Sequence, residues 1–92
     1  MRLYEIVLVL KSSLKDDERK KLVTGVKDAL KDFKIIKDEE WGLKPLAYKI
    51  KKELSGHFHL MHVEGENGIA KDFETSLIRN ENILRHILIR RK

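Results

Sequence analysis

One segment restricts the possible folds more than any other, because residues 3–10 are apolar at nearly every position. Their sequence, Leu-Tyr-Glu-Ile-Val-Leu-Val-Leu, is rich in β-branched and aromatic side chains, which favours a β-strand. Successive side chains of a strand point to opposite faces, so this strand presents apolar groups on both sides. Such strands are usually central and covered on both faces. We therefore expect residues 3–10 to lie in the middle of a sheet.

The next segment has helical periodicity. Residues 14–33 place most of their apolar side chains on one stripe, with Lys and Asp on the remaining surface. Ser13, followed by Asp16 in an acidic first turn, resembles a helix N-cap. We predict a helix over 14–33 that is capped by Ser13.

Extended patterns fill much of the second half of the chain. Residues 35–52 alternate in hydrophobicity around the acidic patch 38–40, which we interpret as a solvated loop rather than a cation site. Pro45 cannot donate a ladder hydrogen bond, so this strand belongs at a sheet edge, with a bulge near Gly42 to Pro45. Ser55-Gly56 predicts a hairpin turn. The remaining predicted elements are a strand over 57–64, a short helix over 69–79, a turn over 80–82 and a strand over 83–89.

The order strand, helix, strand, strand, helix, strand is that of two interlocked β-α-β units, the ferredoxin-like α+β sandwich. We predict a single domain over 1–92, with a four-stranded antiparallel sheet and two helices on one face. Right-handed crossovers place the first and third strands in the centre. The second and fourth strands are then the edges, which agrees with Pro45.

Composition excludes several classes of protein. The chain has no cysteine, so disulfide scaffolds, thiolate zinc sites and thiol nucleophiles are excluded. No apolar run approaches the ~20 residues of a membrane helix, and the acidic start does not match a secretion signal. We expect a cytosolic protein, and its net charge of +5 is a modest indication of a polyanionic partner.

The side chains that could perform chemistry form no convincing site. His57 and His59 would share one strand face while His62 lies on the other, so we predict no metal site. The glycines form no phosphate-binding loop, and the serines lack a recognisable His and Asp arrangement. We predict no cofactor, no small-molecule substrate and no enzymatic activity.

One sheet face must pack on the helices, and the other is predicted to be unusually apolar. If Ile6, Leu8 and Leu10 face the helices, a normal register places many apolar side chains on the second face, which exceeds what a monomer usually exposes. This pattern favours a protein or nucleic-acid partner, although scattered surface aliphatics remain an alternative. The expected members are Leu3, Val7, Val9, Phe58, Leu60, Ile87 and Ile89.

Basic residues are concentrated in two segments. Residues 43–52 and 83–92 contain several Lys and Arg and no acid. Arg2 and Arg79 are expected near the same end as the last strand. Such a rim would suit phosphate contacts, or it would be a Lys-rich edge that blocks strand addition.

The same element order occurs in RNA-recognition motifs, whose central strands stack bases on aromatic side chains. Phe58 fits that pattern, but alternation places Tyr4 on the helix-facing side. Base stacking on the sheet is therefore disfavoured.

Five short motifs follow one another across nearly the whole chain: Met-Arg-x-Tyr-Glu at 1–5, Glu-Trp-Gly at 40–42, Leu-Ala-Tyr-x-Ile-x-Lys at 46–52, Leu-Met-His-Val-Glu at 60–64, and a closing strand that starts with Asn-Ile-Leu-Arg at 82–85 and runs to Arg90. In this order and at this spacing, they resemble the family of the sixth protein of the bacterial small ribosomal subunit. Two positions depart from the family pattern: Lys49 stands where a proline is common, and Pro45 where a basic or polar residue is usual.

The resemblance implies a structural constituent of the small ribosomal subunit. Such a protein would bind the central domain of small-subunit ribosomal RNA in a heterodimer with ribosomal protein eighteen, and it would have no catalytic role. We expect RNA contacts from Arg2, Lys44, Arg79, Asn82 and Arg85. Arg79 could instead stabilise a helix dipole. The expected contacts with the partner protein are Trp41, Tyr48, Phe58, Leu60, Ile87 and Ile89, where Trp41 and Tyr48 could equally cover the core.

Two alternatives come from the fold. One is a self-associating ferredoxin-like regulatory or ligand-binding module. The other is a small enzyme of the acylphosphatase type, but the loop Lys11-Ser12-Ser13 lacks the glycine and arginine that such an enzyme needs.

Overall fold

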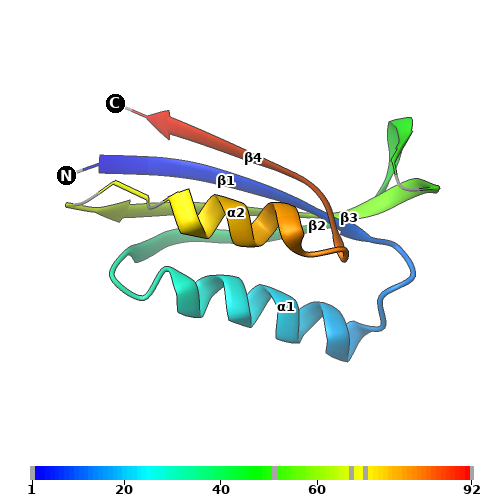
Figure 1. Cartoon of the computed structure of the whole chain (residues 1–92), viewed down its shortest axis with the longest axis horizontal. Helices are drawn as coiled ribbons and strands as arrows, with labels where there is room; N and C mark the ends of the chain where they lie inside the picture. Colours follow the sequence, from blue (N-terminus) through cyan, green and yellow to red (C-terminus); the bar gives the residue numbers. More distant parts are fainter. Residues whose placement is uncertain (1, 51, 67, 70, 92) are drawn as a thin grey trace.

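The computed structural model describes residues 2–50, 52–66, 68–69 and 71–91, and its elements follow the predicted order (Figure 1). They form the ferredoxin-like α+β sandwich, with both helices on one side of the sheet. The strands are β1 (Arg2–Lys11), β2 (Lys34–Ile50), β3 (Glu53–Gly65) and β4 (Ile83–Arg91), and the helices are α1 (Asp16–Ala29) and α2 (Lys71–Arg79).

The sheet is antiparallel with strand order β2-β3-β1-β4. This order confirms the prediction that β1 and β3 are central and that the proline-bearing β2 is an edge. β1 pairs with β3 from Arg2 opposite Gly65 to Lys11 opposite Gly56. The two ends of β1 therefore define the two ends of the sheet.

The core lies between the helices and one face of the sheet. Ile6, Leu8 and Leu10 of β1 are 0% exposed, because they point toward the helices as alternation predicts. Burial of each such side chain contributes about 1.5–3 kcal/mol. Tyr4 is also buried in this core and packs on the Phe33 ring in a T-shaped arrangement, which confirms that it faces the helices. The helices add Val23, Val26, Phe73 and Leu77 to the core.

Helix α1 is shorter than predicted and begins at a different cap. Ser13 does not cap it; the N-cap is Lys15, whose backbone N–H donates to the Glu18 carboxylate at 3.2 Å. The hydroxyl of Ser12 instead donates to Glu53. The acidic first turn, which complements the helix dipole, therefore determines the start better than the serine pair does.

The hairpin between β2 and β3 turns earlier in the chain than predicted. Ser55 and Gly56 are wrong as the turn, because they lie within β3 opposite Pro45 and Lys44. Residues 51–52 connect the two strands. Lys51 lies outside the described residues, and Lys52 has φ 68°. A Cβ on Gly56 would approach Val9 Cγ1 to 2.7 Å. Glycine is needed there for close packing of β3 on β1.

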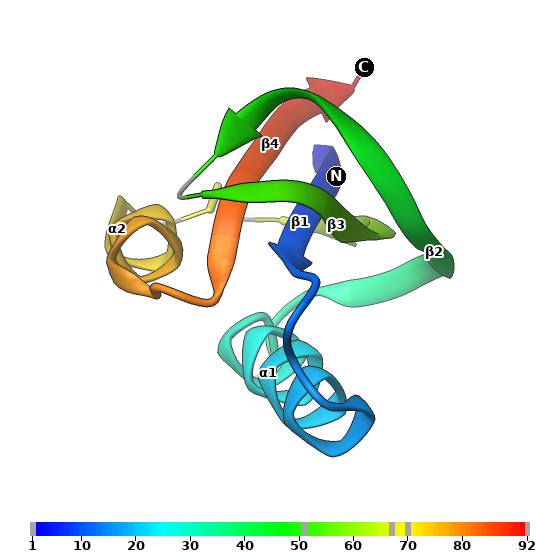
Figure 2. The ribbon, with the colours of Figure 1, turned by 90° about the vertical axis from the view of Figure 1, so that its right-hand side faces the viewer.

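β2 is irregular on both sides of the segment predicted to hold a bulge, while Gly42 to Pro45 themselves pair regularly with β3. Register shifts occur between Glu40 and Gly42, where Gly42 has φ 82°, and again between Pro45 and Ile50. Because residues 46–49 have no partner on β3, the strand leaves the sheet there. We call residues 45–50 the arch. Figure 2 shows this end of β2 passing above β3 on the side away from α1.

Candidate functional site

The sheet face that the helices leave free, here called the open face, carries the predicted apolar residues. The strand register places Val9 beside Phe58, and Val7 between Leu60 and Ile87. Ile89 follows opposite Glu5. The apolar pattern of this face is therefore confirmed.

Exposure divides these open-face residues into two groups. Ile87 and Ile89 are 37% and 45% exposed, and Trp41 is 44% exposed. Leu60 is only 4% exposed, so the isolated chain offers little of this side chain to a partner. It lies on a central strand, between Val7 and Glu39 in register, where neighbouring side chains enclose it.

Charged side chains interrupt the open face near one end. Glu5 lies between His62 Nε2 at 3.6 Å and Arg91 Nη1 at 3.4 Å, and the latter contact is an ion pair. On β2, the Glu39 carboxylate binds Lys37 Nζ at 2.9 Å and accepts from Trp41 Nε1 at 3.4 Å. These contacts with Lys37 and Trp41 lower the pKa of Glu39. The hydrogen bond places the Trp41 indole N–H on the same side of β2 as Glu39.

The arch encloses a cavity of about 200 Å³ against the open face. We call this cavity the hollow. Arg85, predicted for RNA, lines it together with Tyr48, Phe58 and Ile87, which were predicted for the partner protein. Tyr48 is 77% exposed. The remaining lining residues are Val9, Pro45, Leu46, Ala47 and Ile50.

Several predicted RNA-binding residues meet at one end of the sheet. Gly56 of β3 lies between Lys44 of β2 and Lys11 of β1 in the register of the sheet. The backbone N–H of Lys11 donates to the carbonyl of Asn82 at 2.9 Å. Arg79 is in the last turn of α2, just before Asn82. Lys11 was not predicted, although its place at the end of the first strand could have identified it. We call this group the basic end: Lys11, Lys44, Arg79 and Asn82.

Arg2 does not join the basic end, which corrects the expectation that Arg2 and Arg79 lie together. It is at the start of β1, opposite Gly65, whereas Asn82 contacts Lys11 at the far end (Figure 1). At ~3.3 Å per residue, the length of β1 separates them by about 30 Å. The Nη1 atom of Arg2 lies beside Gly68, and a Cβ added at Gly68 would approach that atom to 2.6 Å. Arg91 is near Arg2, and Lys92 lies outside the described residues.

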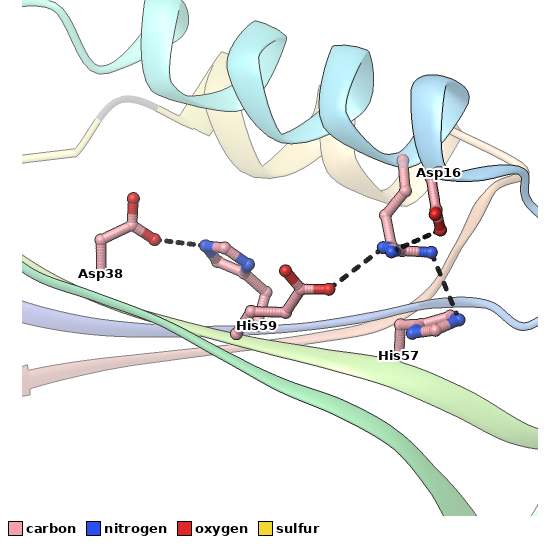
Figure 3. Close-up of polar contacts among 6 residues, drawn as sticks. Asp16, Asp38, His57 and His59 are labelled. Atoms are coloured by element: carbon pink, nitrogen blue, oxygen red, sulfur yellow. Dashed lines mark hydrogen bonds and ion pairs between the residues drawn. The ribbon is translucent and has the colours of Figure 1, made fainter.

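The histidines are divided between the faces as predicted. His57 and His59 lie on the side of α1, where His57 Nε2 is 3.4 Å from Arg19 Nη1 (Figure 3). His62 lies on the open face, opposite Glu5. Among the described residues, no group of three potential ligands could hold a metal ion.

The acidic patch 38–40 is part of β2, so its interpretation as a solvated loop is wrong. Each carboxylate has a cationic partner: Asp38 binds Lys27 and His59, Glu39 binds Lys37, and Glu40 Oε1 is 3.3 Å from Arg19 Nε. Arg19 also binds Asp16 at 2.8 Å (Figure 3). Partial burial raises the pKa of Asp38, but hydrogen bonds from Lys27 and His59 outweigh it and hold that pKa below its usual range. Within the patch, Asp38 and Glu40 join α1 to the sheet.

The geometry defines a class: a small basic ferredoxin-like α+β protein, with one sheet face free of helices and cations gathered at the sheet ends. No helix in the described part of the chain has the length and apolarity to cross a membrane. The profile of the family described as ribosomal protein S6 matches residues 3–90.

Individual relatives agree with this match. The small ribosomal subunit protein bS6 of Clostridioides difficile is 33% identical over 90 residues, covering 97% of this chain and 98% of that protein. The Desulforudis audaxviator protein of the same name is 32% identical and covers 98% of each. The crystal structure of 30S ribosomal protein S6 from Thermotoga maritima is similar with a TM-score of 0.90 and 27% identity, over 98% of this chain and 87% of that one. The chain belongs to the ribosomal protein S6 family, and it is a protein of the small ribosomal subunit in the cytoplasm.

Proposed function

We propose that this chain binds the central domain of small-subunit ribosomal RNA as a heterodimer with ribosomal protein eighteen, as a structural component without catalytic activity. The observation that carries the proposal is the apolar open face, where Trp41, Ile87 and Ile89 stay 37–45% exposed. Exposed apolar area of this kind marks a surface for another macromolecule. Membership of the ribosomal protein S6 family makes a ribosomal partner the best candidate.

The basic end supports the RNA part of the proposal. Lys11 and Lys44 lie in one line across the end of the sheet, and Asn82 continues that line. Lysine and arginine would neutralise phosphates there, while the Asn82 amide would donate to backbone oxygens. Arg85 lies one row inward, opposite Val9, so it borders both the RNA and the protein surface.

Arg2 would be a separate RNA contact. Since it is about 30 Å from the basic end, one phosphate group could not contact both. The RNA would have to extend along the sheet, or Arg2 would only hold the segment near Gly68.

The test is a binding titration with a fragment of the central domain of the ribosomal RNA, with and without ribosomal protein eighteen, at several salt concentrations. We expect tight binding only from the heterodimer, with a log–log salt slope of about −0.7 to −0.9 per phosphate contacted. Equal affinity with and without the partner, or a flat salt response, would contradict the proposal.

Single substitutions test which basic residues contact RNA phosphates. Lys44→Gln and Arg79→Gln should each lower the magnitude of the salt slope by about 1, whereas Lys31→Gln on the turn after α1 should not. If Arg79 only stabilises the α2 dipole, its variant will lose stability and keep the slope. A stable homodimer in sedimentation, with no heterodimer, would favour the self-associating module instead.

A further inference from the structure

The hollow beneath the arch is a second, more specific feature of the open face. Its volume of about 200 Å³ lies below the ~300–1,000 Å³ of pockets for small-molecule ligands. It is large enough for a single side chain. Its lining comes from all four strands, since Val9, Phe58 and Ile87 form the floor and the arch forms the cover.

The chemistry of the lining selects the occupant. Apart from Arg85, the lining is apolar or aromatic. A nucleobase entering the hollow would lose the hydrogen bonds of its polar edge without replacement, which is costly. An aliphatic or aromatic side chain loses no such bonds and fills the type of desolvated pocket that anchors protein interfaces.

Arg85 gives this surface a charge preference. It is exposed, and no ion pair joins it to an acid within the described part of the chain. A partner carboxylate next to the inserted side chain would therefore complement it.

The arch supplies free backbone groups. Residues 46–49 are extended but have no partner on β3, because the ladder is interrupted between Pro45 and Ile50. An unpaired strand segment can accept an extended peptide, which gains affinity from main-chain hydrogen bonds and specificity from a pocket for an alternate side chain. The hollow and the free segment adjoin each other, so one peptide could use both.

We propose that an extended segment of the partner protein pairs with residues 46–49 and inserts one large apolar side chain into the hollow, with an acidic group placed against Arg85. This inference rests on the heterodimer proposed above and specifies how the partner is held. It assigns Tyr48 and Phe58 to the bound side chain, and Trp41 and Ile89 to the surrounding contact.

The first test fills the hollow. Ala47→Trp should weaken the heterodimer with ribosomal protein eighteen by about 10-fold or more, because its ring occupies the space of the anchor. Ala29→Trp, the same substitution on the helix side, is the matched control and should leave the affinity unchanged. Arg85→Gln should cost about 3- to 10-fold and Arg90→Gln, on the other face of β4, should cost nothing.

The second test is hydrogen exchange, which needs no variant. The amides of residues 46–49 should exchange rapidly in the free protein and become protected in the RNA-free heterodimer. A heterodimer that forms without this protection, or that tolerates Ala47→Trp, would overturn the inference while the proposed function stands. Protection by the RNA fragment alone, or by self-association at high concentration, would also overturn it. If no heterodimer forms at all, the proposed function fails and this inference fails with it.

Discussion

The two faces of the sheet are built from the same strands, but only the open face carries large apolar side chains that stay well exposed. On the helix-covered face, Ile6, Leu8 and Leu10 are 0% exposed. On the open face, the neighbouring strand supplies Ile87 and Ile89 at 37% and 45% exposure. Because side chains alternate along a strand, one sequence can use one face for stability and keep the other for binding. Substitutions on the two faces should therefore affect different measurements.

The largest expected effect is on the helix-covered face. Leu8→Ala should lower the free energy of unfolding by about 2–5 kcal/mol, since it leaves a cavity among fully buried neighbours. Ile87→Ala, on the open face, should cost clearly less because its side chain is already partly solvated. Urea denaturation of both variants makes the comparison. Equal losses would show that the open face also carries the fold.

A second variant tests how closely the central strands pack. Gly56→Ala should cost about 1–3 kcal/mol, because its Cβ would approach Val9 Cγ1 to 2.7 Å and the Leu10 carbonyl oxygen to 3.1 Å. Gly25→Ala, in the middle of α1 with no atom within 4 Å, is the control and should stabilise by about 0.5–1 kcal/mol. If thermal melts showed that both variants raise, or both lower, the melting temperature, the close packing at Gly56 would be contradicted.

The bend that carries the arch over the open face contains a strained residue. Lys52 has φ 68°, a left-handed conformation that disfavours side chains with a Cβ. Lys52→Gly should raise the free energy of unfolding by about 0.5–1 kcal/mol. Lys34→Gly, in the extended start of β2, should lower it by a similar amount. Chemical denaturation compares the two, and a loss at Lys52 would argue against the strain.

The smallest effect depends on pH and compares the two sides of β2. The pKa of Asp38 is lowered in the folded protein, so its contacts stabilise at pH values above the unfolded pKa of about 3.9. That stability is lost as the pH falls through the lower, folded pKa.

Asp38→Asn should therefore cost at most about 1 kcal/mol at pH 7, and this cost should disappear in strong acid. Glu39→Gln, on the exposed open side, should change stability less. Denaturation midpoints from pH 7 to pH 2 measure both variants. A cost of Asp38→Asn that stayed constant over this range would refute the assigned ion pairs.

Most of the fold could be predicted from the sequence because periodicity encodes it. The apolar run at 3–10 gave the central strand, and Pro45 gave the edge. The helix-facing and open-facing positions followed from alternation, including the burial of Tyr4. These patterns repeat over many residues, so one unusual residue does not change them.

Local features were harder to predict because one residue can serve two purposes. Gly56, next to Ser55, is typical of a turn sequence, but here the lack of a side chain allows β3 to pack closely against Val9 of β1. The burial of Leu60 depends on neighbours from other strands, which are distant in sequence. The opposite positions of Arg2 and Arg79 could have been foreseen, since an antiparallel last strand begins where the first one ends.

The central position of β1 also affects how the chain acquires its structure. β1 is synthesised before β4, which is one of its two sheet partners. The Lys11 N–H likewise cannot bond to the carbonyl of Asn82 until that later residue has been added. The core is therefore incomplete until residues 83–91 have been synthesised. Such long-range pairing slows folding and leaves apolar strands unprotected meanwhile. During synthesis, β1 therefore lacks one of its two sheet partners until the last strand has emerged from the exit tunnel of the ribosome.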